Sequence, residues 1–107
     1  MIICSMLHDL QGANVTRGEK TTETAPIVIA FAAVLKRLRR DAGLSQTRLA
    51  AASHVSLRYV AALEAASYQP SITVMQNLAQ VLGLPLSEMV RLVEQELASS
   101  ENRPSDA

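Results

Sequence analysis

The side chains best able to do chemistry in this sequence are basic, and they gather in one segment. The 107 residues carry ten Lys and Arg against ten Asp and Glu, so the charge of the whole chain favours no class of partner. Residues 30–70, however, contain six basic and two acidic side chains, a local balance of +4. Such a segment could bind an anionic surface. Its basic members are Lys36, Arg37, Arg39, Arg40, Arg48 and Arg58.

Catalytic, redox and metal chemistry have little support in the sequence. The single cysteine, Cys4, excludes an intrachain disulfide and any cysteine-based zinc site, and it suits a reducing cytoplasm. Two histidines, His8 and His54, are too few for a metal site. No carboxylate has a His, a Cys or a second acid at a spacing that would make a catalytic pair. We therefore expect no enzymatic activity, no metal, no cofactor and a cytoplasmic location.

The elements that must position the basic residues are predicted to be helices. From Ile27 to Leu97, apolar residues recur at helical spacing, and no window alternates with a period of two. Turn residues divide this pattern into five helices, and Ser45, Ser56 and Ser71 are candidates to cap three of them. The predicted fold class is all-α, a five-helix bundle. Its helices are expected at about 28–42, 45–53, 56–65, 71–83 and 85–97.

The two ends of the chain are predicted to lie outside this bundle. Residues 1–26 are predicted to form a flexible leader, whose apolar start is too short for a signal peptide or a membrane span. An alternative makes residues 1–7 a strand that pairs with a second copy of the chain. Residues 27–98 form the predicted domain, and residues 99–107 a disordered tail.

Two of the expected helices are short and are joined by a tight turn, which is the arrangement of a helix-turn-helix. Apolar anchors recur from Gln46 onward, and Ala50 is small enough for a close helix crossing. This pattern resembles the Cro and phage-repressor helix-turn-helix family, also called the XRE type, from about residue 31 to 90. The resemblance implies a lambda-repressor-like fold with the motif at the second and third helices. The matching positions are Leu35, Leu38, Arg39, Gly43, Leu44, Ser45, Gln46, Leu49, Ala50, Val55, Ser56, Val60, Leu63, Glu64, Pro70, Ser71, Leu78 and Ala79.

Two positions depart from the family pattern. His54 and Ala66 stand where the family usually has glycine. Histidine is among the residues that tolerate a positive φ, so we interpret His54 as a turn residue rather than a pH sensor. Alanine tolerates it less well, which leaves the geometry of the loop from Ala66 to Gln69 open.

The resemblance implies that the third helix enters the major groove of double-stranded DNA with its N-terminal residues against the base edges. Arg58 could then hydrogen-bond a guanine or contact a phosphate. Gln46 lies at a helix N-terminus, where backbone N–H groups and the helix dipole favour a phosphate. Tyr59 could line the DNA backbone or pack in the core. The candidate DNA-binding residues are Ser45, Gln46, Arg48, Ser56, Leu57, Arg58, Tyr59, Ala61, Ala62, Ser67, Tyr68 and Gln69.

The same resemblance implies that Arg39 and Glu64 form a structural ion pair behind the third helix. The last helix carries an apolar stripe longer than four short helices can cover, and we predict that part of it faces a second copy of the chain. A symmetric dimer would bind a palindromic operator. The predicted dimer contacts are Met89, Val90, Val93 and Leu97.

The predicted function is therefore sequence-specific DNA binding by a homodimeric transcriptional regulator, with DNA and a second copy as partners and no membrane. The sequence is similar to single-domain controller proteins of restriction–modification systems, while phage-type repressors and antitoxins are open alternatives. A rival interpretation is a protein-interaction module on the same fold. Leu57 and the nearby alanines favour that module, whereas Arg58, Gln46 and the basic segment favour DNA.

Overall fold

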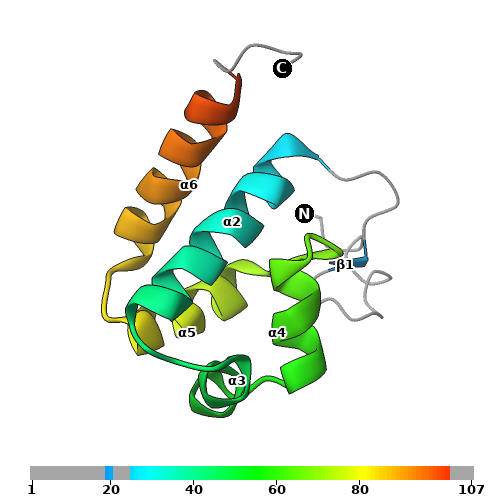
Figure 1. Ribbon diagram of the computed structural model, residues 1–107, viewed down its shortest axis with the longest axis vertical. Helices are drawn as coiled ribbons and strands as arrows, with labels where there is room; N and C mark the ends of the chain where they lie inside the picture. Colours follow the sequence, from blue (N-terminus) through cyan, green and yellow to red (C-terminus); the bar gives the residue numbers. More distant parts are fainter. Residues whose placement is uncertain (1–18, 21–24, 102–107) are drawn as a thin grey trace, which may run out of the picture.

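Five helices make up most of the described chain, and they confirm the predicted all-α class (Figure 1). The computed structural model describes residues 19–20 and 25–101. The predictions for residues 1–18, including a strand at 1–7, for residues 21–24 and for residues 102–107 therefore lie outside it. Figure 1 shows α6 alongside α2. α3 and α4 meet at the opposite end of the molecule from the C-terminal end of α6. The helices are α2 (Pro26–Asp41), α3 (Gln46–Ser53), α4 (Leu57–Glu64), α5 (Ile72–Leu82) and α6 (Leu86–Glu101).

A short antiparallel pairing joins β1 (Glu19–Lys20) to β2 (Tyr68–Gln69), with Glu19 opposite Gln69. The sequence did not predict this pairing, because strands of two residues are too short to show an alternating pattern. β1 therefore brings part of the predicted leader against the loop that follows α4.

Serine residues stand immediately before three of the helices and cap them, as predicted. The side-chain oxygen of Ser45 accepts a hydrogen bond from the Arg48 amide at 3.0 Å. Ser56 accepts one from the Tyr59 amide at 3.0 Å. Ser71 caps α5 in the same way. Each cap satisfies a backbone N–H that the helix leaves unpaired, so α3 and α4 begin at fixed residues.

The first and last helices extend beyond their expected limits. α2 begins at Pro26, because proline is well accommodated in the first turn of a helix. α6 continues to Glu101, into the segment predicted as a tail, because no glycine or proline interrupts it after Pro85. None of the described helices has the length and apolar character needed to span a membrane.

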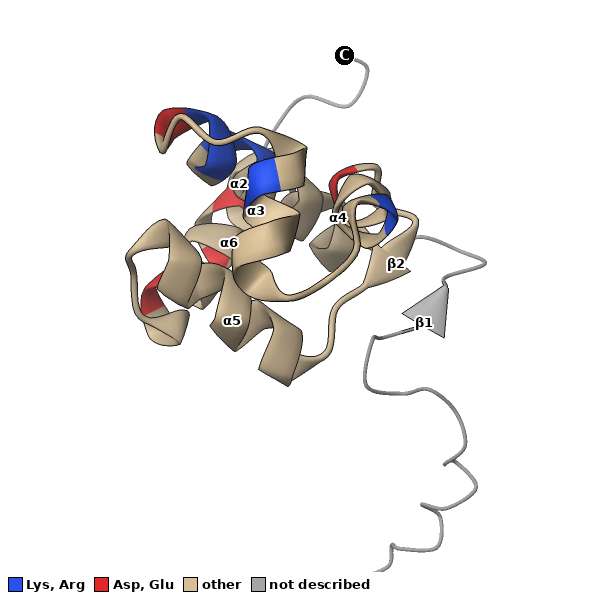
Figure 2. Ribbon diagram, turned by 90° about the horizontal axis from the view of Figure 1, so that it is seen from below, with Lys and Arg blue, Asp and Glu red and all other residues tan. Residues whose placement is uncertain are grey.

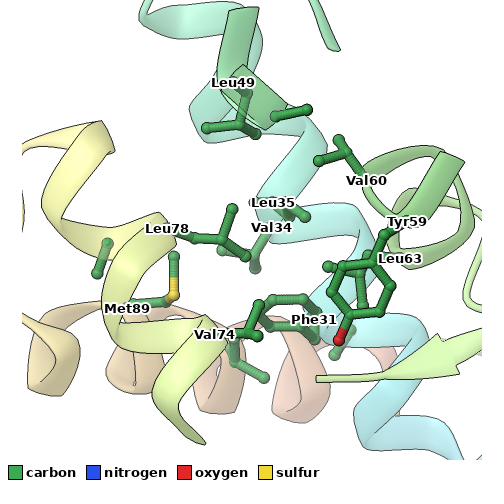
Figure 3. Close-up of a cluster of buried hydrophobic side chains, with 14 residues drawn as sticks. Phe31, Val34, Leu35, Leu49, Tyr59, Val60, Leu63, Val74, Leu78 and Met89 are labelled. Carbon is green, nitrogen blue, oxygen red and sulfur yellow. The ribbon is translucent and has the colours of Figure 1, made fainter. Parts of the chain in front are cut away.

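The core lies where the helices meet and consists mainly of aliphatic side chains (Figure 3). Leu35 of α2, Leu49 of α3, Leu63 of α4 and Leu78 of α5 are completely buried. Because each of these helices contributes a buried leucine to one cluster, the core fixes α3 and α4 relative to the longer helices.

Met89 belongs to this core, which corrects the predicted dimer contacts. Its side chain is 0% exposed, and Val93, one turn further along α6, is also buried. Both belong to the core cluster formed where α6 packs against α2 and α5. The helical period identified the apolar face of α6, but the period does not say which neighbour covers that face. Of the four predicted contacts, Val90 is exposed and Leu97 half-buried.

Candidate nucleic-acid interface

The turn between α3 and α4 has the compact geometry that a helix-turn-helix requires. α3 is followed by His54, whose φ of 62° lies in the left-handed region. The amide of Val55 donates to the carbonyl oxygen of Ala50 at 3.1 Å, which closes the end of α3. Ala50 is itself buried. Its small side chain allows the two helices to approach closely.

One face of α4 is buried in the core, and the opposite face is exposed near the N-terminus of the helix. Val60 and Leu63 are completely buried and hold the helix on the core. Leu57 is 46% exposed, and Arg58 beside it is exposed. Ala61 and Ala62, about one turn further on, are half-buried. The outward face of α4 therefore presents one cation and several apolar side chains near its N-terminus.

Tyr59 lies in the core rather than on this outward face. Only 6% of its surface is exposed, and its ring lies edge-on to the ring of Tyr68, with centroids 6.1 Å apart. Such an edge-to-face pair is favourable, and here it connects α4 to β2. The sequence left two roles open for Tyr59, and its burial fits core packing and not a contact along the DNA backbone.

The C-terminal end of α4 is anchored through Glu64. Arg39 donates from Nε to Oε2 of Glu64 at 2.6 Å and from Nη2 to Oε1 at 3.0 Å, a two-point contact. Gln46 donates from Nε2 to the same Oε1 at 3.0 Å. Arg39 also donates from Nη1 to the carbonyl oxygen of Leu44 at 2.8 Å. These bonds join α2, the loop before α3, the first residue of α3 and the last residue of α4.

The resemblance implied the pairing of Arg39 with Glu64 but not the part of Gln46 in it. Gln46 was expected to contact a phosphate, and no local signal in the sequence indicates its bond to Glu64. That bond depends on how closely α3 and α4 approach each other, which is a property of the packed core.

Burial and hydrogen bonding act in opposite directions on Glu64. Its side chain is 2% exposed, and burial alone would raise the pKa of its carboxyl group. Hydrogen bonds from Arg39 and Gln46, with the positive charges of Arg39 and Lys36, outweigh burial and hold that pKa below its ordinary value. The bond to Glu64 in turn raises the pKa of Arg39. The carboxylate is therefore charged at neutral pH and compensated, so it does not repel a phosphate as a lone acid would.

The loop after α4 contains the second non-glycine residue with a left-handed backbone in the described chain. Ala66 has a φ of 62°, which costs an L-residue about 1–2 kcal/mol. The loop is nevertheless closed, because the amide of Ser67 donates to the carbonyl oxygen of Ala62 at 2.9 Å. Alanine thus adopts the conformation that the family usually gives to glycine. Ser67 and Gln69 are exposed, and Tyr68 is half-buried.

The six basic residues of segment 30–70 lie on the helices that carry or support the motif. Figure 2 shows blue segments on α2, α3 and α4. Arg48 and the capping residues Ser45 and Ser56 are exposed. Residues 71–98, by contrast, carry one basic and three acidic side chains. No group of three or more His, Cys, Asp or Glu that could hold a metal occurs within residues 19–20 and 25–101.

The arrangement of α3 and α4 on the other helices defines a helix-turn-helix protein. The family model HTH_3, described as Helix-turn-helix, matches residues 35–89. The chain therefore belongs to this XRE-type family of helix-turn-helix transcriptional regulators, as the resemblance implied. A protein of Sinorhizobium fredii (strain NBRC 101917 / NGR234), named as the uncharacterized HTH-type transcriptional regulator y4dJ, is 39% identical over 54 residues, which cover 50% of this chain and 70% of that protein.

Solved structures of other regulators share the fold. The clp gene regulator ClgR from Corynebacterium glutamicum matches with a TM-score of 0.68 and 24% identity, over 74% of this chain and 84% of that chain. The restriction-modification controller protein C.Esp1396I matches with a TM-score of 0.64 and 19% identity, over 68% of this chain and 95% of that chain. At these identities the likeness concerns the fold alone.

Proposed function

We propose that this chain is a sequence-specific DNA-binding regulator that acts as a homodimer on a palindromic operator. The observation that carries the proposal is the division of α4 into an exposed N-terminal end, with Arg58, and a C-terminal end fixed through Glu64. A recognition helix needs both, because a side chain that reads bases must be held in register with them. The proposal includes a cytoplasmic location and involves neither an enzymatic activity nor a cofactor.

In this proposal α4 lies in the major groove and provides the base contacts. Arg58 donates two hydrogen bonds to a guanine. Leu57, Ala61 and Ala62 offer apolar contact, which suits the methyl groups of thymine. Because a single polar side chain reads bases directly, part of the specificity is assigned to the shape and deformability of the operator.

Phosphate contacts are assigned to both sides of α4. The amide nitrogen of Gln46 carries two hydrogens, of which one is donated to Glu64 and the other is directed to a phosphate. The bond to Glu64 fixes the direction of this amide before DNA binds. Arg48 and the N-terminus of α3 contribute on the same side. Ser67 and Gln69, exposed beyond the C-terminal end of α4, contribute on the other side.

The proposed dimer surface is an apolar groove of about 190 Å³ beside α6. Two apolar residues of its lining are exposed, Ile27 by 48% and Val90 by 37%. Exposed apolar side chains around one groove are typical of a contact between protein surfaces, and a symmetric pair of copies would cover them. The lining includes Ile27, Val28, Phe31, Pro70, Met75 and Val90.

The test of the proposed function is the retention of random duplex fragments by the purified chain across a salt series, followed by sequencing. We expect an enriched palindrome whose binding weakens steeply with salt. Retention without sequence preference, or no retention, would contradict the proposal. It would favour the rival protein-interaction module, for which the exposed apolar Leu57 is the natural contact.

The dimer is tested by sedimentation of two variants on α6. Val90→Lys places a charge in the proposed contact, whereas Gln95→Lys places the same charge at an exposed position of the same helix outside the groove lining. We expect the wild-type chain and Gln95→Lys to sediment as dimers and Val90→Lys as a monomer. A dimer with recognition helices ~34 Å apart then predicts half-sites separated by one helical turn of DNA. A monomeric wild-type chain bound to its operator would exclude this surface.

A further inference from the structure

Two cations of α2 that the sequence did not assign to any site lie one helical turn apart. Lys36 and Arg40 stand at positions i and i+4, so they share a face of the helix. Together with Arg37 they line a groove of about 670 Å³ that runs between α2 and the C-terminal end of α4. Arg40 is exposed and Lys36 half-buried.

The neighbouring cations of α2 already have acidic partners. Arg39 is bound to Glu64, and Nη1 of Arg37 lies 3.3 Å from Oε1 of Glu96 on α6. Within the part of the chain that the structure describes, Lys36 and Arg40 form no ion pair. Two positive charges without an ion-pair partner thus border this groove, whose lining also includes the acids Asp41 and Glu64.

These two charges are continuous with the proposed phosphate contact at the start of α3. Arg40 lies almost at the end of α2, only a short loop before Gln46. That loop is held to α2 by the hydrogen bond from Arg39 to the carbonyl oxygen of Leu44. Lys36 lies close enough to Glu64, the partner of Gln46, to favour its charged form. Figure 2 shows the basic end of α2 near the basic segment of α3.

We infer that Lys36 and Arg40 contact DNA phosphates next to the phosphate that Gln46 contacts, so that the backbone interface extends from the helix-turn-helix onto α2. The inference depends on the proposed DNA binding. Contacts of this kind position the protein and strengthen binding without reading sequence. They would therefore strengthen binding to the operator and to any other duplex by the same factor.

The experiment compares two double variants in the same salt series. Lys36→Gln with Arg40→Gln removes the two unpaired charges, and Arg37→Gln with Arg91→Gln removes two charges that face Glu96 and Glu88. Binding is measured to the selected operator and to a random duplex of equal length. Thermal unfolding of each variant is measured beside the wild-type chain, so that a loss of binding can be separated from a loss of fold.

We expect the first pair to reduce the slope of log affinity against log salt by about 1.8, since each phosphate contact contributes about 0.9. The preference for the operator over the random duplex should stay unchanged. The second pair should change the slope by less than half as much. Equal changes in the two double variants would show an effect of net charge only, and an unchanged slope in the first would exclude phosphate contact; either result overturns the inference.

A measurement on the wild-type chain keeps the inference testable even when a variant is unstable. Ethylation of single phosphates should interfere with binding at phosphates next to those of the recognition helix, on the side of α3. Interference confined to the phosphates nearest Gln46 and the loop after α4 would overturn the inference and leave the proposed function standing. If the wild-type chain binds no duplex at any salt, both proposals fall together.

Discussion

The two ends of α4 are held in different ways. At the C-terminal end, Glu64 is nearly inaccessible and accepts hydrogen bonds from α2 and α3. At the N-terminal end, the Ser56 cap fixes the backbone, but Leu57 and Arg58 extend into solvent. One helix of 8 residues thus combines a fixed end with an open end.

This difference separates what holds the helix from what it can recognise. Substitution at the open end should change the DNA sequence that is bound with little effect on folding, whereas substitution at the anchored end should weaken the fold. Surface positions away from such buried contacts usually change stability by less than about 0.5 kcal/mol. The contrast can therefore be measured as a change in DNA sequence preference at one end and a change in the free energy of unfolding at the other.

Removing the anchor should have the largest effect. Arg39→Ala leaves the carboxylate of Glu64 buried without its ionic partner, and we expect the free energy of unfolding to fall by about 3–5 kcal/mol. Urea unfolding measures it, with Arg91→Ala as a control because its ion pair with Glu88 is exposed. The double variant Arg39→Met with Glu64→Leu should recover most of the loss. A loss below about 1 kcal/mol in Arg39→Ala would mean that the anchor is no stronger than a surface ion pair.

Acid should weaken the same anchor by a smaller amount, because a protonated Glu64 still accepts hydrogen bonds. Its pKa is lower in the folded chain than its ordinary value of 4.5, so the unfolded chain takes up the proton more readily. The stabilisation is complete above that value and is lost as the pH falls through the folded-state pKa. Unfolding temperatures measured from neutral to acidic pH should fall more for the wild-type chain than for Glu64→Gln. Parallel curves would contradict this assignment.

At the open end, Arg58→Ala should reduce discrimination for one base pair of the operator by about 1–3 kcal/mol. Its unfolding in urea should match that of the wild-type chain, because the side chain is exposed. Binding to operators with single substitutions gives the position that Arg58 reads. A uniform loss across all sequences would instead assign Arg58 to a phosphate.

The turns on either side of α4 provide the smallest effect. Ala66→Gly should raise the free energy of unfolding by about 1 kcal/mol, because glycine adopts a positive φ without the steric cost that alanine carries. His54→Gly should gain less, because histidine is more often found with a left-handed backbone. Urea unfolding of the two variants compares the turns directly. A larger gain at His54 would reverse this order.

The sequence predicted the helices well because their signals are local. The apolar period, the three capping serines and the terminal glycines each act within one or two turns of a helix. It could not place Met89, because burial of the α6 stripe depends on α2 and α5 packing against it. The sequence left the role of Tyr59 open for the same reason, because its ring packs against Tyr68, which follows α4 in a separate element.

The candidate site was predictable to a similar extent. The positions of Arg58 and of the Arg39–Glu64 pair followed from the family pattern. The bond from Gln46 to Glu64 did not, because it depends on how closely α3 and α4 pack. Nor did the absence of ion-pair partners at Lys36 and Arg40 within the described chain, because it depends on which acids the neighbouring cations bind.

The pairing of β1 with β2 also bears on the order in which the chain folds and opens. It closes a loop that contains α2, α3 and α4, and such closure costs more chain entropy than the local turns of a helix. With strands of only 2 residues it repays little of that cost. We therefore expect it to form last and to open first, so that backbone amides in this pairing exchange with solvent while the amide of Leu35 remains protected. β1 is thus attached to the loop after α4 by a contact that we expect to open while the helices stay folded.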